Sequence, residues 1–301
     1  MTASSYASQT ASDNGRCRVI GSLAEISDQY DATFCDLWGC YHNGVAVYPA
    51  AAAALTAFRG AGGTVILLTN APRPAASVQM MLDRMGAPAA SYDAIVSSGD
   101  ACKAALQSGS HGDAFSYVGP ERDRHVLTDA GFSEAPIDSA TAILLTGLRD
   151  DRTETPADYV DELQAWHARG LTVLCANPDV IVDRGDQRLW CAGAIARDYE
   201  AIGGRVLYFG KPHLPVYQRC HDVLSGLLGH ETPHDRILAI GDGIATDVPG
   251  GIAAGLDTVY VTGGLAARDL GPDPEHPAQD LLDAHLDDVG LTPKYAIGRL
   301  R

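Results

Sequence analysis

The chain has 301 residues, 46% of them hydrophobic and 20% charged, which is an ordinary composition for a soluble globular protein. This length corresponds to about two domains of roughly 150 residues each, and either would be large enough to bury a core without disulfides. The formal net charge of -16 gives an acidic surface that repels nucleic acid and anionic membranes. We therefore expect neither as a partner, and a phosphate-bearing ligand would have to be held by a local arrangement of donors.

The N-terminal segment and the cysteines indicate a protein of the cytoplasm. Residues 1–16 are mostly Ser, Thr, Ala and Asp without an apolar run, which is typical of a flexible tail and unlike a secretory signal. The longest apolar stretch, 45–58, contains Pro49 and is too short to span a bilayer. The seven cysteines form no C-x-x-C pair, so we interpret them as free thiols in a reducing compartment.

The N-terminal part of the chain predicts a parallel βαβ unit. Residues 33–36 form a short apolar run that indicates a buried strand, and residues 64–68 indicate a second one. Between them, Pro49 opens an alanine-rich run that suits a helix with proline at its first position. A helix at about 75–85 and a strand at 94–97 continue the alternation.

The same alternation returns near the C-terminus, with apolar runs at 236–240 and 257–261. We therefore expect a doubly wound α/β core with a parallel sheet, built from residues 17–112 and 205–301 together. Residues 113–204 contain strands and a helix of their own. We expect them to form an inserted second α/β domain.

Polar residues follow several of these strands at the point where each strand ends. Asp36, Thr69 and Asp242 come directly after apolar runs that are far apart in the sequence. The carboxyl ends of parallel strands face one crevice in which ligands bind, so these side chains should meet there. A carboxylate in such a crevice can attack phosphorus. Mg²⁺ held by aspartates, together with Lys211, would offset the charge of the phosphate.

Four short segments, in this order, resemble the motifs of the haloacid dehalogenase (HAD) superfamily of phosphohydrolases. They are Asp36-Leu37-Trp38-Gly39, Leu68-Thr69-Asn70, Gly210-Lys211-Pro212 and Gly241-Asp242-Gly243-Ile244-Ala245-Thr246-Asp247. The position of the insert, between Asn70 and Lys211, is similar to that of class IIA, the branch of 4-nitrophenyl, nucleotide and pyridoxal phosphatases. The resemblance implies a HAD-like, Rossmannoid core with a C2-type cap. It also implies a hydrolase that uses Mg²⁺ and passes through an aspartyl phosphate.

The resemblance further implies roles for individual residues. Asp36 would be the nucleophile, and Lys211 would neutralise the transferring group. The implied phosphate-binding residues are Thr69, Asn70 and Lys211. The implied metal ligands are Asp36, the backbone carbonyl of Trp38, Asp242 and Asp247. In the insert, Asn177-Pro178-Asp179 resembles a cap-side segment of class IIA.

One residue departs from the pattern of the superfamily. Its phosphatases have a second Asp two residues after the nucleophile, which protonates the leaving group and later activates water, and Trp38 stands at that position here. An indole cannot transfer a proton at neutral pH, and loss of a positioned acid–base group costs roughly 10²–10⁴ in rate.

Several alternatives follow from Trp38. His42 or a substrate atom could transfer the proton, the leaving group could need little help, or the protein could bind phosphorylated ligands with little turnover. Superfamily members that act on carbon–halogen or phosphonate bonds also lack this Asp, so a hydrolase of non-phosphoester bonds is a further alternative.

The sequence predicts a small phosphorylated metabolite as the substrate and leaves its identity open. A sugar phosphate, a nucleotide, pyridoxal phosphate and phosphoglycolate all fit, because the cap would choose among them. A homodimer formed through the cap is equally open. The pattern His230-Glu231-Thr232-Pro233-His234 matches the zinc-protease motif H-E-x-x-H, but Pro233 breaks the helix that this motif needs. We interpret it as a polar loop.

Overall fold

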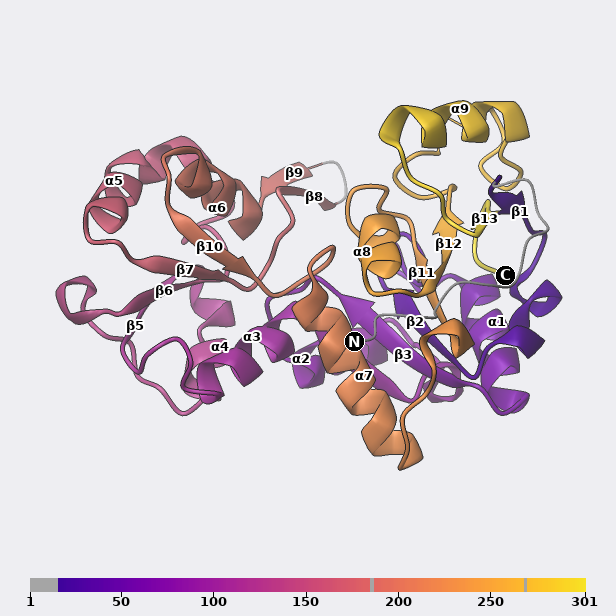
Figure 1. Cartoon of the computed structure of the whole chain (residues 1–301), viewed down its shortest axis with the longest axis horizontal. Helices are drawn as coiled ribbons and strands as arrows, with labels where there is room; N and C mark the ends of the chain where they lie inside the picture. The colour runs from indigo at the N-terminus through magenta and orange to yellow at the C-terminus, as the bar shows by residue number, and fades with distance from the viewer. Residues whose placement is uncertain (1–15, 185–186, 268–269) are drawn as a thin grey trace, which may run out of the picture.

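The structure is a computed structural model that describes residues 16–184, 187–267 and 270–301. Residues 1–15 of the expected tail lie outside the described part of the chain. Figure 1 shows an elongated molecule with one sheet toward each end. All seven cysteines are buried and unpaired, as expected. Among the described residues, no helix is both long enough and apolar enough to cross a membrane.

The larger sheet has seven parallel strands in the order β1-β13-β12-β11-β2-β3-β4. Its strands are β1 Arg18–Val19, β2 Ala32–Asp36, β3 Thr64–Thr69, β4 Ala94–Ser97, β11 Ile237–Gly241, β12 Asp257–Val261 and β13 Tyr295–Ile297. The central strands β2 and β11 are buried along their whole length, as parallel strands covered on both faces are. Both ends of the chain therefore build one sheet, which confirms the expected α/β core.

Helices cover both faces of this sheet. They are α1 Pro49–Gly60, α2 Ala75–Arg84, α3 Ser98–Gln107, α7 Leu214–Leu228, α8 Asp247–Ala253 and α9 Gln279–Val289. Pro49 is the first residue of α1, and Ser97 caps α3 by accepting the N–H of Asp100 at 3.0 Å. Leu55 of α1 and Leu224 of α7 belong to two different apolar clusters, one on each face of the sheet. The core is therefore doubly wound.

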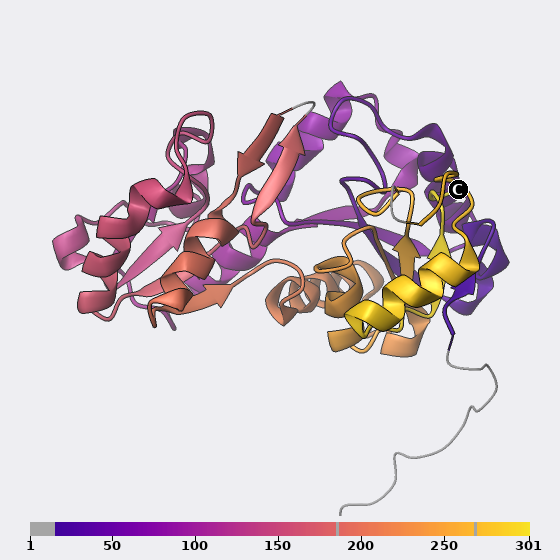
Figure 2. The same ribbon diagram turned by 90° about the horizontal axis from the view of Figure 1, so that it is seen from above.

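The smaller sheet has four parallel strands in the order β10-β7-β6-β5. Its strands are β5 Phe115–Val118, β6 Ala142–Leu145, β7 Thr172–Cys175 and β10 Arg205–Tyr208, and its helices are α4 His125–Thr128, α5 Val160–Ala168 and α6 Ala192–Ala201. Trp166 of α5 and Tyr199 of α6 pack on one face of the sheet with Val173. The antiparallel hairpin of β8 Ile181–Arg184 and β9 Gln187–Trp190 follows β7 (Figure 2).

Short 3-10 turns complete the described secondary structure. They are η1 Leu23–Glu25, η2 Ser27–Gln29, η3 Ala89–Ser91, η4 Glu121–Asp123, η5 Ile137–Ser139, η6 Pro156–Tyr159 and η7 His234–Arg236. The last of these contains His234, so the H-E-x-x-H pattern lies in a loop and a turn before β11 rather than on a helix.

The expected end of the insert at residue 204 is wrong by several residues. Strand β10, which we assigned to the core, pairs in parallel with β7, with Tyr208 opposite Cys175. The insert therefore extends at least through Tyr208. A four-residue strand next to a pair of glycines has the same apolar pattern in either sheet, so only the pairing partner distinguishes the two assignments.

Candidate active site

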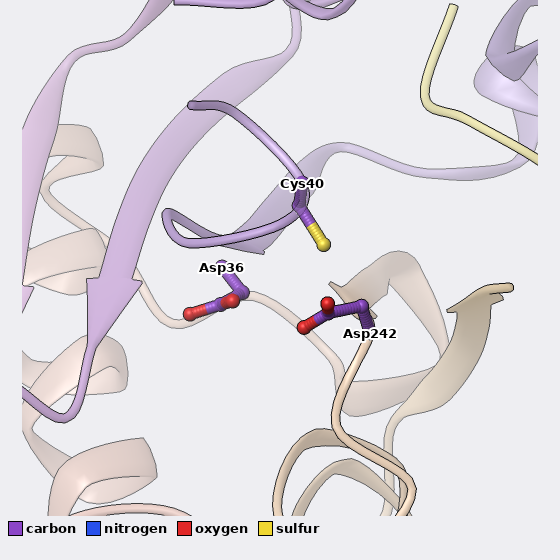
Figure 3. Close-up of side chains that lie close together, drawn as sticks. All are labelled: Asp36, Cys40 and Asp242. Atoms are coloured by element: carbon purple, nitrogen blue, oxygen red, sulfur yellow. The ribbon is translucent and has the colours of Figure 1, made fainter. Parts of the chain in front are cut away.

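Asp36 and Asp242 lie at the point where the strand order of the larger sheet reverses. Asp36 ends β2, and Asp242 directly follows β11, the neighbouring strand. From there the chain proceeds to β3 on one side and to β12 on the other, which is the usual position of a ligand site in such a sheet. Oxygen atoms of the two carboxylates and the sulfur of Cys40 all lie within 4.8 Å of one another (Figure 3).

Two glycines allow Asp242 to come this close. A Cβ atom on Gly39 would lie 2.1 Å from Asp242 Oδ2, and one on Gly264 would lie 2.0 Å from the same atom. Gly39 also has a φ of +80°, which residues with a side chain rarely adopt. The N–H of Leu265 donates to Asp242 Oδ2 at 3.0 Å and fixes the carboxylate in this gap.

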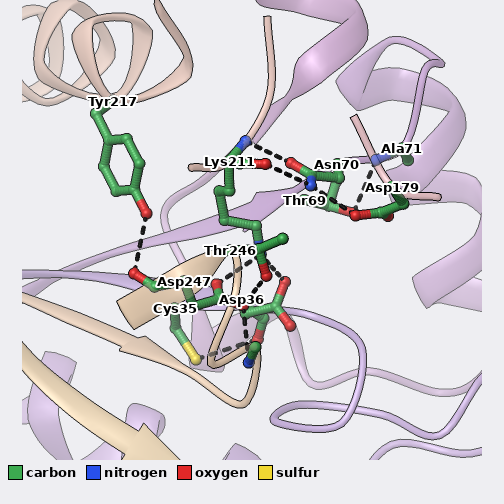
Figure 4. A network of polar contacts seen from close by, with 11 residues as sticks. Cys35, Asp36, Thr69, Asn70, Ala71, Asp179, Lys211, Tyr217, Thr246 and Asp247 are labelled. Carbon is green, nitrogen blue, oxygen red and sulfur yellow. Dashed lines mark hydrogen bonds and ion pairs between the residues drawn. The ribbon is translucent and has the colours of Figure 1, made fainter. Parts of the chain in front are cut away.

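Lys211 bridges two of the aspartates of the site. The residue is 3% exposed, and Nζ forms an ion pair with Asp36 and a second one with Asp247 at 2.6 Å (Figure 4). Burial lowers the pKa of Lys211, but Asp247 and Asp36 outweigh that effect and raise it well above its usual range. The lysine is therefore charged. It lies on the segment that leads from β10 in the smaller sheet to α7 in the core.

Asp247 begins α8, and its carboxylate is held on several sides. Besides the ion pair with Lys211, its Oδ2 accepts the N–H of Gly243 at 3.1 Å and the hydroxyl of Thr246 at 3.2 Å. Gly241 leaves room for this side chain, because a Cβ there would lie 2.1 Å from Asp247 Cγ. Among the described residues, the close group of possible metal ligands contains Asp36 and Asp242 without Asp247. The expected role of Asp247 at the metal stays a prediction.

Asn70 connects the core, the lysine and the cap. Its Oδ1 accepts the backbone N–H of Lys211 at 2.7 Å, and its Nδ2 donates to the carbonyl of Lys211 at 3.0 Å. The same Nδ2 donates to Asp179 Oδ1 at 2.8 Å, from the loop after β7. Because an amide has two N–H hydrogens and both are used here, the side chain has none left for a substrate in this arrangement. The expected contact of Asn70 with the substrate stays a prediction.

Thr69 ends β3, next to the strand of Asp36. Its Oγ1 accepts the N–H of Ala71 at 3.2 Å, which leaves the hydroxyl hydrogen for another acceptor. Its expected role in phosphate binding stays a prediction.

Trp38 and His42 pack against each other in the segment that follows Asp36. Their rings meet edge to face with centroids 5.4 Å apart, and a Cβ on Gly44 would lie 2.3 Å from the Trp38 ring. His42 is 1% exposed, and its Nδ1 accepts the N–H of Gly44 at 2.9 Å. Burial lowers the pKa of His42 to about 4. It is therefore a neutral, enclosed imidazole at pH 7, which makes it a poor source of a proton for a leaving group.

The electrostatics of the two facing carboxylates suit a bound cation. Burial raises the pKa of Asp36 well above its usual range, with Lys211 opposing it and Asp247 and Asp242 adding to it. Burial and Asp247 likewise raise the pKa of Asp242 to about 7, against the N–H of Leu265 and Lys211. A divalent cation between them would remove this penalty, and their oxygen atoms are ligands that Mg²⁺ prefers. The residues present therefore fit the metal that the sequence predicts.

The sequence did not predict two residues that lie beside Asp242 in this site. Cys40 has no partner at a recognisable spacing, so nothing in the sequence separates it from the other buried cysteines. Gly264 follows β12 and gives no signal beyond a glycine pair at a strand end. Asp179 was noticed only as part of a cap-side segment, although it contacts Asn70 of the core.

Comparisons with known proteins agree with this geometry. Residues 33–133 match the sequence model of the haloacid dehalogenase-like hydrolases, and residues 208–288 match a second, HAD-hydrolase-like model. A haloacid dehalogenase-like hydrolase from Brucella suis 1330 is 37% identical, with a TM-score of 0.81 over 93% of this chain and 99% of its own. The chain belongs to the HAD superfamily.

Other HAD members are similar over most of the chain. Ribonucleotide monophosphatase NagD of Escherichia coli K12 is 26% identical over 238 residues, which cover 78% of this chain and 88% of that protein. The 4-nitrophenylphosphatase structure from Thermotoga maritima has a TM-score of 0.69 at 20% identity and covers 90% and 95% of the two chains. With its α/β insert between Asn70 and Lys211, this HAD hydrolase has the class IIA arrangement.

Proposed function

We propose that this hydrolase is a Mg²⁺-dependent phosphatase that acts on a small phosphorylated metabolite through an aspartyl phosphate on Asp36. The observation that carries the proposal is the position of Asp36. Its carboxylate has the ammonium of Lys211 on one side and the carboxylate of Asp242 on the other. The names of NagD and of the 4-nitrophenylphosphatases support a phosphate monoester as the substrate class.

The chain's own residues supply the first step. Asp36 attacks phosphorus as the carboxylate, and the ion pair with Lys211 favours that form against the effect of burial. Lys211 and the hydroxyl of Thr69 hold phosphate oxygens during the transfer. A Mg²⁺ bound by Asp36 and Asp242, with the carbonyl of Trp38 as the expected third ligand, would neutralise charge on the phosphoryl group. Water then hydrolyses the aspartyl phosphate.

No obvious acid protonates the leaving group in the first step, and no obvious base activates water in the second. Trp38 cannot supply a proton, and His42 is neutral and enclosed. We therefore propose that the natural leaving group needs little protonation or brings its own proton. Trp38 also favours a second candidate function, hydrolysis of a non-phosphoester bond by the same nucleophile.

One assay separates these functions. Release of 4-nitrophenol from 4-nitrophenyl phosphate is measured with Mg²⁺, with a chelator, and for Asp36→Asn with Mg²⁺. Turnover that requires Mg²⁺ and disappears in Asp36→Asn supports the phosphatase. Equal background in all three would exclude it and favour the second candidate. A panel of phosphorylated metabolites, from sugar phosphates to nucleotides, would then identify the substrate.

The surroundings of the reaction are part of the proposal. We propose that the enzyme works in the cytoplasm, because its seven cysteines are unpaired thiols that suit a reducing compartment. Its net charge of -16 argues against nucleic acid and anionic membranes as partners.

A further inference from the structure

Cys40 is held beside the two acids by a tight turn rather than by a flexible loop. The N–H groups of Tyr41 and His42 both donate to the carbonyl of Leu37 at 2.9 Å, and the N–H of Gly39 donates to the carbonyl of His42 at 2.9 Å. Cys40 is 1% exposed, and Figure 3 shows its sulfur on the side of Asp36 and Asp242. The turn therefore fixes the direction of the thiol.

A neighbouring cysteine provides the contrast. Cys35 immediately precedes Asp36 and is equally buried, but its sulfur donates to the backbone carbonyl of Asp36 at 3.3 Å. Among the described residues, the close group of possible ligands contains Cys40 and not Cys35. Cys35 is therefore closer to Asp36 in the sequence, but Cys40 is the cysteine whose sulfur lies at the site.

We propose that Cys40 is a third side-chain ligand of the divalent-cation site, and that it makes the site bind thiophilic cations such as Zn²⁺ and Co²⁺ in competition with Mg²⁺. This inference rests on the proposed metal site at Asp36 and Asp242. Thiolate selects zinc-like ions, whereas carboxylate and carbonyl oxygens suit Mg²⁺. The sulfur gives its proton to solvent when the ion binds, as cysteine ligands do.

The distances permit such a ligand set. A zinc ion lies about 2.3 Å from a cysteine sulfur and about 2.0–2.2 Å from a carboxylate oxygen. Three ligand atoms within 4.8 Å of one another therefore need only a small side-chain adjustment to surround one ion. Asp36 would then be tied to a tightly held ion, so Zn²⁺ should inhibit the Mg²⁺-dependent reaction.

Cobalt gives a readout that does not depend on activity. Co²⁺ is titrated into the full-length protein, and the near-ultraviolet thiolate-to-cobalt charge-transfer absorption is followed for wild type, Cys40→Ala and Cys35→Ala. We expect the absorption in wild type and Cys35→Ala and its loss in Cys40→Ala. The Kd for Zn²⁺ should rise at least about tenfold in Cys40→Ala, the lower end of the cost of losing even an outer-shell partner of a metal. The Kd for Mg²⁺ should change less than about twofold, because Mg²⁺ makes little use of sulfur.

The outcomes separate this inference from the proposed function. If Cys40→Ala keeps the absorption and the Zn²⁺ affinity while Asp242→Asn loses Mg²⁺ binding, Cys40 is not a ligand but the metal site stands. If wild type binds neither Mg²⁺ nor Co²⁺, both proposals are wrong. Thermal unfolding and circular dichroism show whether Cys40→Ala is folded. Cys40→Ser is a second variant that keeps the volume and lacks the soft ligand, and it should behave as Cys40→Ala does.

Discussion

Three carboxylates and the ammonium group of Lys211 are buried together at the site. Asp36, Asp242 and Asp247 are each less than a tenth exposed, and Lys211 is ion-paired with two of them. Buried charges without full compensation disfavour the folded state, so the chain carries a stability cost at this site. Such a cost is expected where function requires a strained arrangement of charges.

Asp242→Asn should therefore stabilise the metal-free protein at high pH. The pKa of Asp242 in the folded chain is about 7 against a usual 3.8, so its charged form opposes folding above pH 7, and this penalty vanishes as the pH falls toward 4. Asparagine is neutral and still accepts the N–H of Leu265. At pH 8 we expect a gain on the order of 2–4 kcal/mol in the free energy of unfolding, measured in urea with chelator present. The gain should shrink toward zero near pH 4.

The exposed residue Asp222 provides the control. Asp222→Asn on α7 should change the free energy of unfolding by less than about 0.5 kcal/mol at either pH. A loss of stability in Asp242→Asn at pH 8 would contradict the charge penalty. Addition of Mg²⁺ should stabilise the wild type and leave Asp242→Asn almost unaffected.

Trp38→Asp should show whether the missing acid limits turnover. With 4-nitrophenyl phosphate, whose leaving group needs little protonation, we expect a change in kcat of at most a few-fold. With an alkyl phosphate such as a sugar phosphate, we expect kcat to rise by about 10²-fold, within the range of general acid catalysis. His42→Gln is the matched control, and its pH profile should follow the wild type because His42 is already neutral at pH 7. Equal effects of Trp38→Asp on both substrates would show that no acid is missing.

At the scale of residues, the sequence predicted what parallel-sheet geometry dictates. Asp36 and Asp242 meet because Asp36 ends β2 and Asp242 directly follows the neighbouring strand β11, and an apolar run followed by a polar residue is visible in the sequence. Cys40 was not predicted, because its direction depends on the turn at Gly39 and on hydrogen bonds to Leu37. The hydrogen bonds of the Asn70 amide within the protein were not predicted either, because a sequence pattern does not show which partners a side chain meets, and its substrate contact stays a prediction.

At the scale of elements, the loop after β7 and the end of β3 hold the segment of Lys211 between them. Pro178 packs so closely that a Cβ on Gly210 would lie 2.6 Å from its Cδ and 2.5 Å from Asn70 Oδ1. The side-chain amide of Asn70 therefore fixes the backbone of Lys211, and the absence of a side chain at Gly210 allows this close approach. Small errors at this junction would move Nζ relative to Asp36.

Asn70→Ala should therefore reduce kcat more than it raises KM. The substitution leaves the buried backbone N–H and carbonyl of Lys211 without their partner, which costs about 1–3 kcal/mol in the free energy of unfolding. A displaced lysine should lower kcat by roughly 10–100-fold, the effect of a misplacement of about 1 Å. Steady-state kinetics and urea unfolding measure the two effects. Asn43→Ala, in the exposed turn where Asn43 accepts the N–H of Ala46, is the control and should leave kcat unchanged. A rise in KM alone would return Asn70 to direct substrate binding.

Elements were predicted best where an apolar run is long and flanked by turn residues. Strand β3 was expected at 64–68 and observed at Thr64–Thr69, and the helix at about 75–85 was observed as Ala75–Arg84. Strand β10 was assigned to the wrong sheet, because its partner β7 lies about 30 residues away in the sequence and no local signal identifies it.

At the scale of the whole molecule, the net charge of the chain and the charge of the proposed phosphate-ester substrate have the same sign. A net charge of -16 repels a phosphate ester at long range, while Lys211 attracts it only at close range. Salt screens the long-range part much more strongly than the buried part.

We therefore expect kcat/KM to rise with ionic strength. Between about 20 and 200 mM salt, kcat/KM for 4-nitrophenyl phosphate should increase about two- to tenfold, because the Debye length falls from about 20 Å to below 10 Å. Initial rates at saturating Mg²⁺ give this value. The affinity for Mg²⁺ should fall instead, so its apparent Kd should increase over the same range. A flat or falling kcat/KM would contradict this prediction and show that the electrostatic potential at the site entrance is not negative.

The position of Lys211 on the segment between the two sheets has a consequence for chimaeras in which the cap of one enzyme replaces that of another. The smaller sheet ends at Tyr208, α7 begins at Leu214, and Lys211 lies between them. A chimaera that exchanges caps between relatives therefore cannot treat the cap as a self-contained module. A graft that changes the direction of β10 would also move the ammonium group of Lys211 relative to Asp36, so a new cap would alter the site as well as its covering.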